Sequence, residues 1–416
     1  MDRREALSLG LAAAAGTFLT CGPRAASRAP APAASAPPAK IDIPPPVPPA
    51  TYARRRQQLS DRMRQEGIDA LLLTPSPALL YLTGADLWRS ERLIATVLRP
   101  DGSCDSLGPA FEADRLKGSG LPGSLLTWEE SEDPVPRLAR LLAASGAALK
   151  LAVEGTTWYD DLAPLSRSLP SARLLSASPL ISPLRMKKEP EEIALIRCAG
   201  RITLAIIARL MKEMADGVTE KEVLRRGEEI ARTWDVPLDG MVQFGANSAI
   251  PHAASGDTKL REGDVVLFDL GVTVHGYHSD VSRTFAFGRP PGRFQEVYGI
   301  VRSAQDAGFR AARDGAPAQT VDEAARSVIR RAGFARQFTH RLGHGLGLQV
   351  HEPPYLVEGN PTLLAEGMTV TVEPGIYLPG LFGVRLEDDV RVAAGGGQIL
   401  SSESEGPPAG GPPEAG

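Results

Sequence analysis

Histidines and acids gather toward the C-terminal end of the chain. The sequence holds six histidines, and three of them, His340, His344 and His351, fall within twelve residues. Glu373 and Glu387 follow them. Imidazole nitrogens and carboxylate oxygens bind divalent metal ions, and both groups can move protons near neutral pH. The cluster therefore indicates a functional site, against the alternative that these are ordinary surface or core histidines.

A carboxylate interrupts an apolar segment further upstream. Asp269 lies in residues 263–271, which otherwise have the apolar, β-branched character of a core strand. An ionised carboxylate there is costly unless it is paired or coordinated. Asp280 follows eleven residues later, and a hairpin turning at Val274 and His275 would set the two acids opposite each other, roughly 5 Å apart. A divalent cation between them would turn their repulsion into coordination.

A second pair of acids repeats this arrangement. Residues 368–373 alternate in polarity and end in Glu373, and the same alternation points Arg385 and Glu387 to one side of their strand. The midpoint between the two glutamates is Gly380, a turn signal. We therefore expect two hairpins that face one another. Four carboxylates and one imidazole suit two hard or borderline metal ions with a shared nucleophilic water.

Two regions must position these side chains. In the first, helical patterns over 54–67 and 135–144 alternate with strand patterns over 68–74, 93–98 and 151–154, which is an α/β arrangement. Polar and aromatic residues of this region gather around Trp88. We expect this segment to be a loop, or else to form one wall of a site that lies elsewhere in the protein.

The second region begins after a charged, proline-ended segment, residues 182–190. Helices are expected over 191–214 and 219–233, the latter with a capping box from Thr219 to Glu222. We predict domains over 51–184 and 185–400.

Composition narrows the chemistry. The 416 residues can form two or more domains, and 46 basic against 50 acidic residues argue against a nucleic-acid partner. Three cysteines are too few for a disulfide scaffold, and their spacing fits no thiolate metal site. Any metal must therefore be bound by oxygen and nitrogen.

The N-terminal segment, residues 1–21, predicts export. Arg3 and Arg4 precede an apolar run over 6–20 that is too short to span a bilayer but suits a signal peptide, and the paired arginines resemble a twin-arginine signal. Cys21 resembles a bacterial lipoprotein cleavage site, although Phe18 and Thr20 depart from the usual pattern. We expect location in the bacterial periplasm or cell envelope, with a membrane tether through lipidated Cys21; the alternative is a cysteine inside an ordinary signal.

Two segments are not expected to fold. Residues 22–50 are dominated by proline and alanine, which favours an extended linker. Residues 401–416 are rich in proline, glycine, serine and glutamate, and we expect a disordered tail.

Together, the motifs resemble the pita-bread metallopeptidases, in particular the Xaa-Pro aminopeptidases and prolidases. The resemblance covers residues 52–399 and is strongest from 247 to 389. The matching segments are 248–252, 268–271, 279–285, 343–348, 350–354, 372–377 and 383–389. Each segment alone is a weak signal, but their order is specific.

The resemblance implies five metal ligands. They are Asp269, Asp280, His344, Glu373 and Glu387, with Asp280 and Glu387 bridging two divalent metal ions. Asp269 would bind one ion, and His344 and Glu373 the other. Manganese is the first expectation, and cobalt, zinc and iron also tolerate this ligand set.

The resemblance also implies roles around the metals. Glu373 would act as general base toward the bridging water. His252 and His351 would contact the scissile peptide and steady the tetrahedral intermediate. His340 and Arg385 would recognise substrate, unless Arg385 instead holds one of the bridging acids.

The implied fold is an α/β N-terminal domain followed by an α+β pita-bread catalytic domain of the creatinase and aminopeptidase type. The N-terminal domain favours the proline-specific branch over methionine aminopeptidases, and it implies a homodimer, with Trp88 and its neighbours reaching the partner's site. The expected substrates are proline-containing peptides. Two alternatives stand beside this hypothesis: a non-catalytic pita-bread binding protein, and a metal-free amidinohydrolase resembling creatinase.

Overall fold

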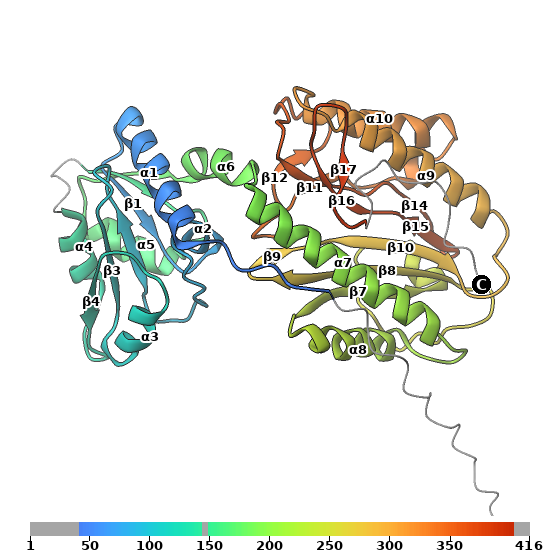
Figure 1. The fold of residues 1–416 in the computed structure, drawn as a ribbon, viewed down its shortest axis with the longest axis horizontal. Coiled ribbons are helices and arrows are strands. Elements are labelled where there is room, and N and C mark those ends of the chain that lie inside the picture. Colours follow the sequence, from blue (N-terminus) through green and yellow to red (C-terminus); the bar gives the residue numbers. More distant parts are fainter. Residues whose placement is uncertain (1–40, 144–148, 403–416) are drawn as a thin grey trace, which may run out of the picture. The chain divides into compact units, whose positions relative to one another are not determined.

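A mixed six-stranded sheet forms the first folded region (Figure 1). The computed structural model describes residues 41–143 and 149–402. The predicted export signal with Cys21, the linker up to residue 40 and the tail beyond residue 402 lie outside these ranges. The strand order is β4-β3-β2-β1-β5-β6, with β2 antiparallel to β1 and β3 and the other pairs parallel.

The elements of this region alternate along the chain. The strands are β1 (Ala70–Leu73), β2 (Ala95–Leu98), β3 (Cys104–Pro109), β4 (Ser124–Trp128), β5 (Lys150–Val153) and β6 (Arg173–Ser176). The helices are α1 (Pro49–Glu66), α2 (Pro77–Thr83), α3 (Ala113–Gly118), α4 (Val135–Ala143), α5 (Tyr159–Ser168) and α6 (Ser178–Met186). The predicted α/β arrangement is confirmed.

The second region holds three smaller sheets. Its helices are α7 (Pro190–Glu213), α8 (Glu220–Ala231), α9 (Phe294–Ala311) and α10 (Ala318–Arg331). Its strands are β7 (Leu238–Phe244), β8 (Val265–Val274), β9 (Tyr277–His278), β10 (Val281–Ala286), β11 (Gly343–Gly345), β12 (Glu352–Leu356), β13 (Thr369–Val372), β14 (Gly375–Leu378), β15 (Phe382–Arg385), β16 (Asp388–Arg391) and β17 (Gln398–Ile399). The sheets run β10-β8-β7, with β9 paired to β8, then β12-β11-β13-β16-β17, and β14-β15.

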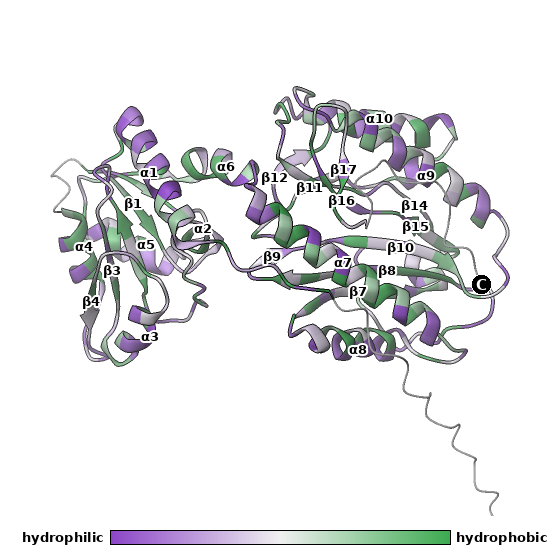
Figure 2. Ribbon diagram, viewed as in Figure 1, coloured by the Kyte–Doolittle hydropathy of each residue, from purple (hydrophilic) through white to green (hydrophobic). Residues whose placement is uncertain are grey.

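Burial explains why these segments fold as they do. In β8 the side chains of Leu270, Val272 and Val274 are buried, while Asp269 and Thr273 on the other face stay partly exposed. Helix α7 packs against this strand. Figure 2 shows hydrophobic residues along the strands and hydrophilic residues on the outer sides of helices such as α8 and α10. The alternation therefore turns Asp269 away from the core and toward the site.

The turn of the first hairpin corrects one prediction. His275 and Gly276 both have positive φ, 47° and 84°, and Val274 pairs with Tyr277. The turn therefore lies one residue later than its predicted centre, and Asp269 pairs with Ser282 rather than with Asp280. The expectation that the two acids face each other directly is wrong. They are instead offset by two residues along the sheet.

The second hairpin turns where the sequence predicts. Strands β14 and β15 pair Gly375 with Arg385, which centres the turn on Gly380. The strands break at each end, so that Glu373 follows β13 and Glu387 precedes β16. The two hairpins meet through backbone contacts, since the amide of Glu387 donates to the carbonyl of Ser282 at 3.1 Å.

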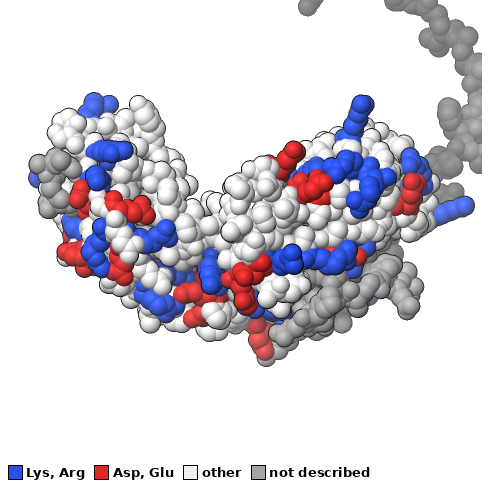
Figure 3. Space-filling view, turned by 90° about the horizontal axis from the view of Figure 1, so that it is seen from above, with Lys and Arg blue, Asp and Glu red and all other residues white. Residues whose placement is uncertain are grey.

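The surface of the described residues is mixed in charge. Figure 3 shows basic and acidic side chains interspersed over the face in view. No helix among the residues that the structure describes is long and apolar enough to cross a membrane.

Candidate metal centre

Five of the predicted residues meet at the junction of the two hairpins and β11. His344, Glu373 and Glu387 bring ligand atoms within 4.8 Å of one another, and so do Asp269, Asp280 and Glu387. The two groups share Glu387. This arrangement offers two adjoining positions for a cation.

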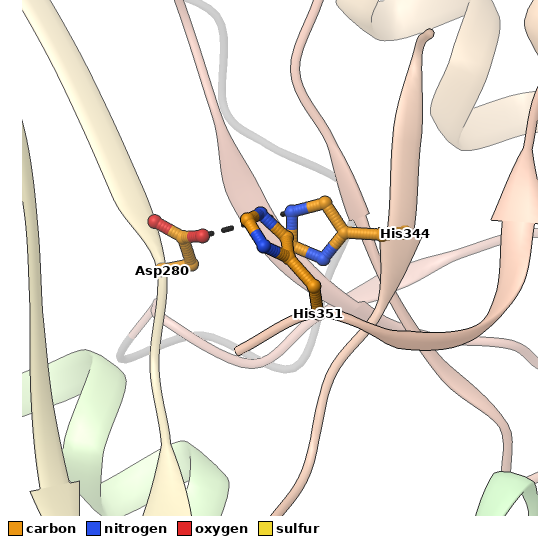
Figure 4. A group of neighbouring side chains, drawn as sticks. All are labelled: Asp280, His344 and His351. Atoms are coloured by element: carbon orange, nitrogen blue, oxygen red, sulfur yellow. Dashed lines mark ion pairs between the residues drawn. The ribbon is translucent and has the colours of Figure 1, made fainter. Parts of the chain in front are cut away.

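His344 presents one ring nitrogen to the acids. Its Nδ1 lies 3.1 Å from the carbonyl oxygen of Gly345, which suits a protonated Nδ1 donating to that carbonyl. Nε2 then faces Glu373 at 3.3 Å, and it lies 3.7 Å from Asp280 (Figure 4). Burial lowers the pKa of His344 to about 4, so the ring is neutral at pH 7 with a lone pair toward the acids. That is the form in which histidine binds metal.

Ionising all of these acids at once is unfavourable, because they are buried and lie close together. Burial, with the neighbouring carboxylates Glu387 and Asp269, raises the pKa of Asp280 well above its usual value. Burial likewise raises the pKa of Glu373 to about 8, and raises that of Glu387. Oxygen-rich, mutually repelling ligands of this kind fit divalent cations, which relieve the repulsion. The residues present therefore fit the metal ions that the sequence predicts.

Arg385 supplies the one buried guanidinium in contact with this acid group among the described residues. Its side chain is 2% exposed; Nη2 donates to Asp269, Nε to Ser282 at 2.9 Å, and Nη1 to the hydroxyl of Tyr377 at 2.9 Å. All its nitrogens thus have protein partners, and it does not line the cavity described below. The geometry favours a role in orienting Asp269 over direct contact with substrate.

A cavity of about 620 Å³ opens over the acids. His252, His340 and His351 line it, as the predicted substrate roles require. His252 has a positive φ of 60°, which aims an exposed side chain from the loop after β7. The rings of His344 and His351 are 4.2 Å apart and nearly perpendicular (Figure 4). Burial lowers the pKa of His351 to about 4, so it too is neutral at pH 7.

His340 is held from both sides. Its Nδ1 lies 2.8 Å from the carbonyl of Arg341, and its Nε2 lies 2.9 Å from the hydroxyl of Tyr377. Burial, followed by the charge of Arg385, lowers the pKa of His340 to about 4. The same tyrosine therefore connects a cavity histidine to the arginine that holds Asp269.

Several residues of the site escaped sequence reasoning. Ser282 donates to Glu387 at 2.6 Å, and the buried carboxylate of Asp389 accepts from the backbone amide of Asp280 at 3.2 Å. Arg341 lines the cavity. Ser282 could have been found, because it lies two residues after Asp280 and shares its face of the strand. The partner of Asp389 is 109 residues away, and no local pattern indicates it.

Two more predicted features lie apart from the cavity. Trp88 is 70% exposed and does not line it. His275 occupies the exposed tip of the first hairpin, as expected of a turn residue. His278, two residues before Asp280, lines the cavity and is partly buried.

Known proteins share this architecture. The model of the family described as Metallopeptidase family M24 matches residues 194–394, and that of the Creatinase/Prolidase N-terminal domain matches residues 55–187. A probable dipeptidase PepE of Mycobacterium tuberculosis is 37% identical over 356 residues, covering 83% of this chain and 93% of that protein.

Solved structures agree. A prolidase from Thermococcus sibiricus superimposes with a TM-score of 0.80 at 33% identity, covering 85% of this chain and 98% of that one. An Xaa-Pro dipeptidase from Bacillus anthracis gives a TM-score of 0.77 at 28% identity, covering 85% and 99%. The predicted pita-bread fold with a creatinase-type N-terminal domain is confirmed.

Proposed function

The chain belongs to metallopeptidase family M24 and is a hydrolase of that family, and on this basis we propose that it cleaves the bond between an N-terminal residue and proline, in dipeptides or longer peptides. The observation that carries the proposal is the convergence of five ligand-type side chains in two groups sharing Glu387, beneath a cavity whose lining includes His252, His340 and His351. The names of the prolidase and Xaa-Pro dipeptidase relatives support the choice of substrate.

The proposed metal site holds two divalent ions, with manganese as the first expectation. Asp280 and Glu387 would lie between the ions, Asp269 would bind one, and His344 and Glu373 the other. Bound at this site, divalent cations supply Lewis acidity toward a carbonyl oxygen and acidify a water molecule.

The protein's own groups carry the remaining steps. Glu373 accepts the proton of the attacking water. Without metal, burial raises the pKa of its carboxyl to about 8, and bound cations would favour the ionised form that can act as a base. His252 and His351 lie at the cavity wall and donate hydrogen bonds to the peptide oxygen as negative charge develops there. Since His351 is neutral at pH 7, it stabilises the oxyanion by its N–H dipole and not as a cation.

The geometry of a peptide bond to proline explains why the enzyme needs a dedicated cavity. An Xaa-Pro bond is a tertiary amide with no N–H and a restricted ring, so a pocket shaped for it gains selectivity over ordinary peptides. Comparing turnover of Ala-Pro with that of Ala-Pro-Ala-Ala, over several metals, separates a dipeptidase from an aminopeptidase.

Metal analysis and substitution test the proposal. Protein loaded with manganese or cobalt should hold close to two ions per chain, and Asp280→Ala and Glu373→Ala should each abolish Ala-Pro hydrolysis without unfolding the protein. Activity retained with no bound metal would favour the creatinase-like alternative. Full metal loading without hydrolysis of any Xaa-Pro peptide would favour the binding-protein alternative.

We also propose an oligomeric state and a cellular location for the protein. A homodimer is proposed because exposed aromatic side chains, Trp88 and Tyr159 at 70% and 78% exposure, remain on the N-terminal domain. Export and a lipid tether through Cys21 are proposed from the sequence alone. Sedimentation equilibrium tests the dimer, and a single-chain mass at micromolar concentration would contradict it.

A further inference from the structure

One carboxylate in the cavity wall belongs to none of the groups above. Asp239 lies on β7, in the cavity lining. The register of β7 and β8 pairs Met241 with Asp269 and Asp239 with Gly271. Paired residues of an antiparallel ladder point to the same side of a sheet, so Asp239 faces the same side as Asp269. The diagonal separation of such neighbours is about 7–8 Å.

Among the residues that the structure describes, the carboxylate of Asp239 has no charged partner. Across the ladder lies Gly271, where a Cβ would come within 2.1 Å of the carbonyl oxygen of Ser279. Glycine is required there because the backbone of Ser279 crosses it. No side chain of β8 therefore stands opposite Asp239. Within the described residues, the hydrogen bond that its carboxylate accepts is from the amide of Gly240, at 2.8 Å, and the side chain is left exposed to the cavity.

The neighbouring histidine does not pair with Asp239. His278 lines the same wall of the cavity, but no ion pair joins the two side chains among the residues that the structure describes. The Nδ1 of His278 lies 3.0 Å from the hydroxyl of Thr273, which holds the ring in place. Within the described part of the chain, this wall of the cavity therefore presents a carboxylate that no cationic side chain pairs with.

The positive charge of the cavity lies elsewhere. Arg341 lines the cavity and acts electrostatically on Glu373, His344 and His351. The lining is thus divided, with a basic side beside Glu373 and an acidic side at Asp239. A substrate that spans the metal ligands would meet charges of opposite sign at its two ends.

We propose that Asp239 is a specificity-determining residue that recognises the cationic side chain of lysine or arginine in the residue preceding proline. The inference rests on the proposed Xaa-Pro hydrolysis, whose substrate class it narrows. A lysine ammonium lies roughly 6 Å from its Cα at the end of a four-carbon stem. That reach matches the diagonal distance from Asp269 to Asp239.

The substrate's α-ammonium is the competing cation. It is two bonds from the scissile carbonyl carbon, so it stays beside the acids of the metal site when that carbonyl is in reach of Glu373. The end of a long side chain extends further along β7. Geometry therefore assigns Asp239 to the side chain and leaves the α-ammonium to the metal site.

The test compares two substrates that differ in one charge. kcat/KM is measured for Lys-Pro and for Nε-acetyl-lysyl-proline, which keeps the stem and removes the cation, with Ala-Pro as a substrate that cannot reach Asp239. The wild type should prefer Lys-Pro by about tenfold, the size of a charge-assisted hydrogen bond that is partly open to solvent. Asp239→Asn should bring the ratio close to one while leaving Ala-Pro turnover unchanged.

Asp235→Asn is the matched control, because Asp235 has the same charge on the approach to β7 but lies outside the cavity lining. This variant should keep the wild-type ratio.

Three outcomes would overturn the inference. They are a wild-type ratio near one, an Asp239→Asn ratio equal to the wild-type ratio, and an equal loss on Ala-Pro and Lys-Pro, which would place the α-ammonium at Asp239. If the wild type cleaves no Xaa-Pro peptide, the proposed function fails, and calorimetry decides the inference separately. Lys-Pro should then bind more tightly than its acetylated form to the wild type and equally to Asp239→Asn, and equal binding to the wild type would contradict it.

Discussion

Ser282 joins the acids of the site to its buried arginine. Its hydroxyl donates to Glu387 at 2.6 Å, accepts from Nε of Arg385 at 2.9 Å, and lies 3.2 Å from Asp269. One small side chain therefore touches acids from both hairpins. Partners of this kind fix the orientation of metal ligands before the metal arrives.

Removing that hydroxyl should weaken the metal site without removing a ligand. Ser282→Ala leaves Nε of Arg385 without its acceptor and frees the carboxylate of Glu387 to rotate. We expect manganese affinity to fall by about 10- to 100-fold, the usual cost of losing such a partner, as measured by calorimetric titration. Ser106→Ala is the control, since it deletes a buried hydroxyl bonded to Thr96, far from the acids. An unchanged affinity in Ser282→Ala would show that Arg385 alone orients the acids.

Substitution of Asp280 distinguishes the contribution of bound metal to stability from that of the carboxylate charge. In the metal-free protein its raised pKa favours the protonated acid, which an asparagine imitates in shape and charge. Asp280→Asn should therefore keep the wild-type Tm in the presence of a chelator, or exceed it. With manganese at 100 times its Kd, the wild type should gain about 2.7 kcal/mol of stability, a few degrees in Tm, and the variant should gain much less. Scanning calorimetry with and without chelator measures both; equal gains would exclude Asp280 as a ligand.

At the scale of elements, a buried ion cluster connects α6 and the segment between α6 and α7 to β12. Glu352 is bonded to Nζ of Lys188 at 2.7 Å and to the guanidinium of Arg185, and the Lys188 and Glu352 side chains are 1% and 3% exposed. Glu352 directly follows His351. The cluster therefore ties the loop that carries a cavity histidine to the beginning of the second region.

The loss of stability caused by Glu352→Gln should depend on pH, because the ion cluster requires an ionised Glu352. Burial alone would raise the pKa of Glu352, but the charges of Lys188 and Arg185 outweigh burial and lower it. Leaving Lys188 buried and unpaired should cost about 3–5 kcal/mol at pH 7. Because the folded-state pKa lies below the unfolded value of about 4.3, the stabilisation is complete at neutral pH and is lost as the pH falls through the folded-state pKa.

Urea unfolding at a series of pH values measures this. The difference between wild type and Glu352→Gln should be greatest near pH 7 and should shrink below pH 4. Asp257→Asn, which breaks an exposed pair with Lys221, should show no measurable change at either pH. A gap between wild type and Glu352→Gln that does not vary with pH would mean that packing, and not the ion cluster, is what the substitution disrupts.

The hairpins show how far periodicity can predict a site. Polar and apolar alternation assigned Glu373 and Glu387 to the correct faces, because the period of a strand is fixed by its geometry, and Asp269 was identified as the one acid that interrupts an apolar strand. The register of the first hairpin was wrong, because it depends on the left-handed conformations of His275 and Gly276, which spacing does not encode. The contact of Ser282 with Arg385 spans 103 residues and depends on how two hairpins pack. Family resemblance supplied the ligand set, but the unpaired carboxylate of Asp239 became visible only with the register of β7.

At the scale of the whole molecule, the described chain joins the core before α1, since Val47 is 4% exposed and Ile41 packs against the same core. The predicted linker over 22–50 is therefore wrong for residues 41–50, and residues 22–40 would separate the lipidated cysteine from the folded protein. An extended proline-rich segment spans about 3.1 Å per residue, so this linker could hold the enzyme tens of ångströms from a membrane. The proposed metal ligands and the histidines of the cavity all come from residues beyond 230, outside the predicted tether.

Loss of the membrane anchor should therefore leave the catalytic activity unchanged. The wild type expressed in a bacterial host should fractionate with membranes, and Cys21→Ala should move to the soluble fraction with kcat/KM for Ala-Pro unchanged, since the substitution removes the lipid acceptor and touches no site residue. Proteolysis of the wild-type membrane fraction within the proline-rich linker should release active enzyme. Two acyl chains bind a membrane stably where one does not. Mass spectrometry of the mature N-terminus therefore shows whether Cys21 carries acyl chains, and how many. A Cys21→Ala protein that still sediments with membranes would rule out anchoring through that cysteine and would direct attention to the exposed aromatic surface around Trp88.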